Sequence, residues 1–133
     1  MEIEFDFKKE ESWIFGAIWR PVASVTFING EREIWESVYV DSGADVTLIS
    51  KSVGDALGFR LEENENITEI KGVGERGVPI VIKKVKVKIG EKLIDTRIAW
   101  ALIEEVPLLL GREDVFSLFD ICFKKNKKTV FCD

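Results

Sequence analysis

The sequence contains no histidine among its 133 residues. This absence excludes a Ser-His-Asp or Cys-His nucleophile pair, an imidazole general base and the usual His-ligated catalytic metal sites. Any catalysis by this chain must therefore use carboxylates, lysine, tyrosine or hydroxyl groups. We expect neither a metal ion nor a cofactor.

The chain also lacks a long apolar run. Its longest stretch without a charged residue spans only residues 21–30, whereas a membrane-spanning helix needs about 20 apolar residues. The first residues, Met1 to Asp6, are acidic and lack the basic start and apolar core of a signal peptide. We therefore expect no membrane span and a cytoplasmic location.

Cysteine is scarce, with only Cys122 and Cys132 near the end of the chain. They lie on either side of a lysine-rich turn, so they could face each other in a hairpin, but the sequence does not establish the distance that a disulfide requires. In a reducing cytosol we expect buried thiols. Two cysteines without histidine make a poor zinc site.

Acidic residues outnumber basic ones, 24 to 19, and the formal net charge is −5. This balance argues against a general nucleic-acid binder, which would carry a basic face. The exception is a group of four lysines around Asn126, which predicts a solvent-exposed hairpin tip or, alternatively, a basic docking patch. These are Lys124, Lys125, Lys127 and Lys128.

Apolar and polar residues alternate with a period of two through most of the chain, which is typical of half-buried strands. The fold class is therefore mainly β. Residues 21–28 and 33–40 are predicted to pair antiparallel around the hairpin signal Asn29-Gly30. Lysines at positions 84, 86 and 88 should point outward, and the apolar residues at 85, 87 and 89 inward.

Further elements follow from turn and capping signals. We predict strands at residues 46–49, 67–71, 78–89, 93–100 and 108–110, and a brief helix that begins at 50–53 and ends at Gly58. Residues 112–119 are predicted to form one or two helical turns before a closing hairpin. The four tryptophans, Trp13, Trp19, Trp35 and Trp100, are expected to serve in core or interface packing.

A polar segment, Asp41-Ser42-Gly43, stands between two apolar strands. Gly43 would let the backbone turn tightly and approach a ligand, and Ser42 offers a hydroxyl that can tie the loop to a neighbour. Asp41 would be the exposed acid at the tip of the loop. Taken alone, the three residues favour an Asx turn that binds only its own backbone.

With its apolar frame, this segment resembles the retroviral-type aspartic proteases, the retropepsin family, and three features carry the resemblance in the expected order. The run Asp-Ser-Gly-Ala-Asp at 41–45 matches the catalytic loop. Gly72-Val73-Gly74, within a hairpin, looks like the flap. Leu109-Leu110-Gly111, followed by a helix, matches the second hallmark, which crosses behind the active-site loop. The resemblance covers roughly residues 21–121.

The resemblance implies a closed or partly open β-barrel with one or two short helices and a flap hairpin. It divides a single 1–133 domain into an N-terminal extension (1–20), a family-like core (21–121) and a C-terminal hairpin arm (122–133). The extension, a flap with fewer glycines than many viral members have, and the lysine-tipped hairpin depart from the family pattern.

The resemblance also implies an aspartic endopeptidase that acts on extended polypeptide. Because the chain holds one Asp-Ser-Gly, the second catalytic aspartate must come from another copy, which implies a homodimer. Asp41, Ser42 and Gly43 would be catalytic. Ala44, Asp45, Gly72, Val73 and Gly74 would bind substrate, and Leu109, Leu110, Gly111 and Arg112 would support the site, with Arg112 paired to Asp45.

Two alternatives remain open at this point. One is a non-catalytic dimerisation or peptide-binding module on the same fold. The other is a small β-barrel in which Asp-Ser-Gly is an accidental turn.

Overall fold

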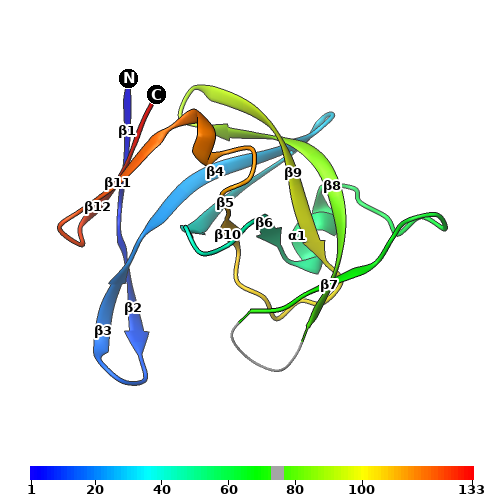
Figure 1. Cartoon of the computed structure of the whole chain (residues 1–133), viewed down its shortest axis with the longest axis horizontal. Coiled ribbons are helices and arrows are strands. Elements are labelled where there is room, and N and C mark those ends of the chain that lie inside the picture. The colour runs from blue at the N-terminus through cyan, green and yellow to red at the C-terminus, as the bar shows by residue number, and fades with distance from the viewer. Residues whose placement is uncertain (73–76) are drawn as a thin grey trace.

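The computed structural model describes residues 1–72 and 77–133 and has a mainly β architecture (Figure 1). Its main sheet has seven strands in the order β4-β5-β10-β6-β9-β8-β7, and β4 also pairs with β8. That additional pairing closes six of the strands into a barrel and leaves β7 outside it, so the predicted barrel is confirmed. The strands are β4 (Val22–Asn29), β5 (Arg32–Val40), β6 (Thr47–Ile49), β7 (Thr68–Ile70), β8 (Val78–Ile89), β9 (Lys92–Ala101) and β10 (Leu109–Leu110).

Alternation along the strands sets the inside and the outside of the barrel. On β8, Val85, Val87 and Ile89 are buried, whereas the lysines between them are exposed. The register Thr26↔Lys88 to Ile28↔Lys86 joins β8 to β4 and completes the closure. The largest fully buried side chains belong to this core and include Phe27, Ile49, Ile98, Trp100 and Leu110.

The predicted hairpin at Asn29-Gly30 is confirmed. β4 and β5 pair antiparallel, and the last pair is Asn29↔Arg32, so the turn residues are Gly30 and Glu31. Gly30 has φ of 63°, in the left-handed region where glycine carries no steric penalty. The Asn29 side chain donates to the Leu57 carbonyl at 2.8 Å, which ties the hairpin to the end of the α-helix in the described residues.

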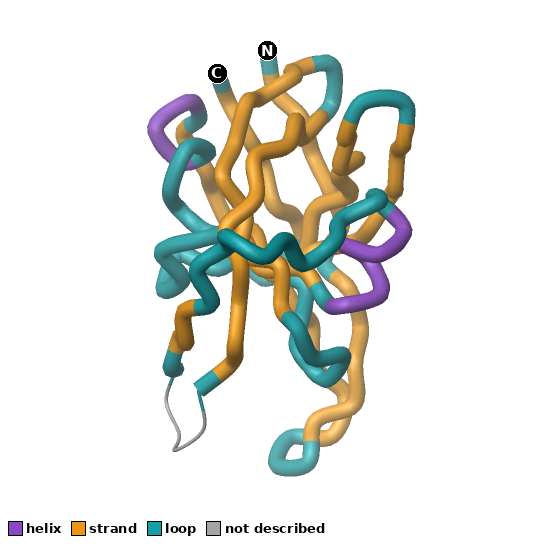
Figure 2. Tube along the Cα trace, turned by 90° about the vertical axis from the view of Figure 1, so that its right-hand side faces the viewer, coloured by secondary structure: helices purple, strands orange, loops and turns teal. Residues whose placement is uncertain are grey.

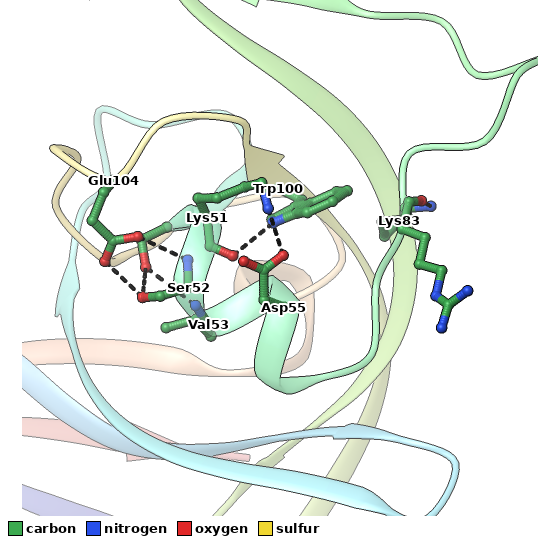
Figure 3. A network of polar contacts seen from close by, with 9 residues as sticks. Lys51, Ser52, Val53, Asp55, Lys83, Trp100 and Glu104 are labelled. Carbon is green, nitrogen blue, oxygen red and sulfur yellow. Dashed lines mark hydrogen bonds and ion pairs between the residues drawn. The ribbon is translucent and has the colours of Figure 1, made fainter.

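That helix, α1 (Lys51–Ala56), begins and ends as its sequence predicts. The Ser50 hydroxyl accepts a hydrogen bond from the Val53 N–H, and Gly58, at φ of 82°, follows its C-terminal end. Figure 3 shows Glu104 reaching the N-terminal end of the helix, where its carboxylate accepts from both the N–H (2.8 Å) and the hydroxyl (2.6 Å) of Ser52. These hydrogen bonds lower the pKa of Glu104.

Strands outside the barrel involve both ends of the chain. The N-terminal extension, for which no element is predicted, supplies β1 (Glu2–Asp6), β2 (Lys8–Ser12) and β3 (Gly16–Arg20), while the predicted closing hairpin is β11 (Asp120–Lys124) and β12 (Lys128–Cys132). β12 lies between β1 and β11 in a three-stranded sheet, and β2 pairs with β3. The termini therefore lie side by side (Figures 1 and 2).

The one or two helical turns predicted in residues 112–119 are present as one 3-10 turn, Phe116–Leu118. The prediction of buried cysteines is wrong. Cys122 and Cys132 are free thiols that pair with Val130 and Asp120, not with each other, and neither is buried. Of the four tryptophans, Trp100 packs in the core, whereas Trp13, Trp19 and Trp35 are exposed in the single chain, so interface packing stays a prediction for these three.

The four turn lysines are exposed, as a hairpin tip requires. Among the described residues, no helix has the length and apolar character needed to cross a membrane.

Candidate active site

The segment Asp41-Ser42-Gly43 begins where β5 ends, so the barrel itself positions it. β10 lies between β5 and β6, parallel to β5 (Leu109↔Tyr39, Leu110↔Val40) and antiparallel to β6 at Leu48. The two apolar residues of β10 thus cross directly beneath the loop that joins β5 to β6. The Asp41 N–H donates to the Leu110 carbonyl at 3.1 Å, which fixes the start of the loop.

Within the loop, the Asp41 carboxylate is oriented by its own neighbours. Its Oδ1 accepts from the Gly43 N–H at 2.8 Å, and its backbone carbonyl accepts from the Ala44 N–H at 3.2 Å. This is the Asx-turn contact that the sequence offers as the alternative, and it also holds the acid in a defined orientation. In the described part of the chain, the second carboxyl oxygen of Asp41 has no hydrogen-bond partner.

Gly111 follows β10 and lies against the backbone on the far side of the loop. A Cβ at this position would stand 2.4 Å from the Val46 carbonyl carbon and 2.5 Å from its oxygen, so only glycine permits the approach. The Gly111 N–H donates to Thr47 Oγ1 at 3.0 Å. The crossing of β10 behind the loop therefore depends on glycine at this position.

Thr47 is a supporting residue that the sequence reasoning missed. It is fully buried, and its hydroxyl accepts the Gly111 N–H, which joins the two halves of the site inside the barrel. The sequence contains one sign of this role, a single hydroxyl in the otherwise apolar run Val46-Thr47-Leu48-Ile49. A buried polar side chain needs a hydrogen-bond partner, so a threonine in a buried strand indicates a specific contact.

Arg112 closes the outer side of the loop. Its guanidinium pairs with the Asp45 carboxylate and donates to the Ser42 carbonyl at 2.6 Å, while its N–H donates to the Ala44 carbonyl at 3.0 Å. The side chains of Arg112 and Asp45 are 44% and 80% exposed, so the ion pair by itself contributes little stability. Its effect is to hold the three loop residues Ser42, Ala44 and Asp45 in one arrangement.

A second arginine anchors the turn that follows. Arg97 of β9 donates through Nε and Nη2 to the Asp114 carboxylate, both at 2.9 Å, and its N–H donates to the same group at 2.9 Å. These hydrogen bonds lower the pKa of Asp114 to about 2. Asp114 has φ of 69°, so the ion pair holds a backbone turn in a left-handed conformation just after Arg112.

The candidate flap is only partly described. β7 and β8 pair antiparallel from Thr68↔Ile80 to Ile70↔Val78, as predicted. Gly72, beyond the end of β7, is exposed. Val73 and Gly74, predicted to bind substrate, lie outside the described residues.

In the single chain, Asp41 stands at an open surface. Ser42 and Gly43 are exposed and Asp41 is partly exposed. Two hollows in the surface lie elsewhere, one between β4, β8 and β9 beside Arg97, the other near Phe7 and Trp19. The described residues of one copy therefore present a single oriented carboxylate at an open surface.

The closed six-strand barrel matches a retropepsin-like fold. Among solved structures, the chain is similar to the EIAV protease complexed with the inhibitor HBY-793, with a TM-score of 0.58 and 27% sequence identity over 74% of this chain and 88% of that chain. No family model and no curated protein matches the sequence. The structural match supports a retropepsin-like fold for this chain.

Proposed function

We propose that the protein is an aspartic endopeptidase whose active site forms between two copies of the chain. The observation that carries the proposal is the oriented Asp41 carboxylate, held by the Gly43 N–H and backed by the Leu110-Gly111 crossing. The similarity to a retroviral protease supports the same chemistry. A single Asp-Ser-Gly per chain requires a second copy to complete the pair.

The proposed mechanism uses the two Asp41 carboxyls and one water. Because two carboxyls about 3 Å apart do not both ionise easily, the pair holds one proton. The ionised Asp41 takes a proton from the water as its oxygen attacks the peptide carbonyl, and the protonated Asp41 gives its proton to the carbonyl oxygen. When the C–N bond breaks, the departing nitrogen receives a proton from the pair, and acid and amine products leave.

The neighbouring residues have positioning roles in this proposal. Ser42 braces the two loops across the interface, and Gly43 leaves room for the substrate backbone. Ala44 and Asp45 line the cleft, where Asp45, held by Arg112, accepts hydrogen bonds from extended peptide. Gly72, Val73 and Gly74 cover the bound substrate and exclude water.

Substitution of the acid tests the proposal. The wild-type protein should cleave an unfolded polypeptide at mildly acidic pH and be inhibited by a pepstatin-like transition-state mimic, and Asp41→Asn should abolish cleavage while the chain stays folded. Asp120→Asn, at an exposed aspartate on β11, is the matched control and should cleave like the wild type. Equal cleavage by Asp41→Asn and the wild type would overturn the assignment, and a folded wild type without activity would favour a non-catalytic binding module.

A further inference from the structure

The β2–β3 hairpin, residues 8–20, projects from the barrel and has no role in the proposed chemistry; we call it the arm. Its strands pair antiparallel from Lys8↔Arg20 to Ser12↔Gly16. Figures 1 and 2 both show the arm extending away from the termini, toward the same end of the molecule as the open end of β7 and β8. It therefore lies on the side of the candidate flap, which is the substrate side under the proposed function.

The tip of the arm is apolar and uncovered. Trp13 is 101% exposed, and Ile14 and Phe15 are each 78% exposed. Together these three side chains present about 500 Å² of surface, given that one aromatic side chain buries roughly 150–250 Å². Exposed apolar surface of this size is often functional.

The tip is held in a defined conformation. The Ser12 hydroxyl accepts hydrogen bonds from the N–H groups of Ile14 and Phe15, both at 3.2 Å. Gly16 closes the turn with φ of 69°, a conformation that favours glycine. A tip ordered in advance loses little conformational entropy on binding, which favours its use as an anchor.

The arm is fastened to β5, the strand that leads into the Asp41 loop. The Tyr39 hydroxyl donates to the Glu10 carboxylate, which also pairs with Arg20 Nε at 2.9 Å. The hydrogen bond to Glu10 and the burial of the ring raise the pKa of Tyr39. Immediately after the arm, the Pro21 carbonyl accepts from the Val40 N–H at 3.0 Å. The arm thus leaves the barrel one to two residues from the catalytic loop.

We infer that the arm clasps the second copy of the chain, with the tip residues Trp13, Ile14 and Phe15 seated on the partner's surface. This inference rests on the proposed function, which brings the two Asp41 loops together at a two-fold axis. The arm starts beside that axis, and its five-residue strands carry the tip about 16 Å from the root. Two-fold symmetry then gives each copy one arm that reaches the other.

The area of the tip is sufficient for such an assembly. The tips of the two arms together present about 1,000 Å² of apolar surface. If each tip covers an equal area of the partner, the dimer buries about 2,000 Å² in total, which lies within the range of stable dimers. A substrate peptide is the competing occupant, since the arm lies on the substrate side. The position of the root beside the two-fold axis favours the partner chain.

Sedimentation equilibrium of three proteins tests the inference: the wild type, the double variant Trp13→Lys with Phe15→Lys, and the control Trp35→Lys. Trp35 is also exposed, at 66%, but lies on the barrel strand β5. We expect the double variant to raise the dimer dissociation constant about 100-fold, because aromatic anchors dominate interfaces, and the control to leave it unchanged. Because the tip makes no burying contact within one chain, the double variant should keep the wild-type circular dichroism spectrum.

The other outcomes are distinct. An unchanged dissociation constant for the double variant, or a wild type that is monomeric throughout, would overturn the inference. A double variant that dimerises normally but cleaves poorly would assign the tip to substrate and overturn it as well. If the arm controls dimerisation while the wild type shows no Asp41-dependent cleavage, the inference stands and the proposed function fails.

Discussion

Replacement of Gly111 by alanine probes the contact that places β10 behind the catalytic loop. The added Cβ would stand 2.4 Å from the carbonyl carbon of Val46, 2.5 Å from its oxygen and 2.9 Å from the Thr47 nitrogen. These are backbone atoms, so no side chain can move aside, and either the loop or β10 must shift. Overpacking of this kind costs about 3 kcal/mol, a large part of the roughly 5–15 kcal/mol that stabilises a typical domain.

The same shift should impair the site. Because Gly111 donates to Thr47 and lies next to the Leu110 carbonyl that holds Asp41, its displacement moves the carboxylate as well. A misplacement of about 1 Å at a catalytic group costs on the order of 100-fold in rate. We therefore expect Gly111→Ala to lower both the free energy of unfolding and the cleavage rate.

Guanidinium unfolding at one fixed protein concentration measures the stability change, since association shifts apparent stability. Gly72→Ala is the control for stability, because its Cβ would meet nothing within 4 Å. It should unfold within about 0.5 kcal/mol of the wild type. If Gly111→Ala also remains within that margin, the crossing does not constrain the loop and the reasoning is refuted.

Two further substitutions test the supporting structure. Gly54→Ala would place a Cβ 2.0 Å from Nε1 of the buried Trp100. We therefore expect the free energy of unfolding to fall by about 3 kcal/mol and the midpoint of thermal unfolding to fall by about 10 °C. An unchanged midpoint would show that the indole ring can move aside. Asp114→Asn removes a carboxyl group whose pKa is about 2 in the folded chain and 3.8 ordinarily. The ionised Asp114 therefore stabilises the fold above about pH 4, and this stabilisation is lost as the pH falls through 2. Solvent screens this ion pair, so we expect the free energy of unfolding of the variant to be lower by about 1 kcal/mol at pH 7. The difference in stability from the wild type should disappear between pH 4 and pH 2. A difference that persists at pH 2 would mean that the charge is not its cause.

Local patterns were sufficient to predict most of the barrel strands. The alternation of lysine with Val85, Val87 and Ile89 identifies both faces of β8, because side chains on a strand alternate between sides. Asn29-Gly30 identifies the first hairpin, since glycine permits the left-handed turn. In both cases the information lies within a few neighbouring residues.

Non-local features escaped prediction because they depend on residues far apart in the chain. The pairing of β12 with β1 brings residue 2 next to residue 132, and no local sequence pattern predicts it. The exposure of Trp13, Trp19 and Trp35 likewise follows from where the strands lie and not from their composition. At the site, the Asp41 loop was predictable from its motif, whereas the bond from Gly111 to Thr47 required the folded chain.

The central claim is that each active site contains two Asp41 carboxyls from two copies of the chain. Mixing the wild type with Asp41→Asn, with exchange of subunits to equilibrium and total protein held constant, tests it most directly. In an equal mixture, only about a quarter of the dimers hold two aspartates, so the account predicts cleavage at about a quarter of the wild-type rate. A rate of about one half would show that each chain acts alone and would contradict the claim.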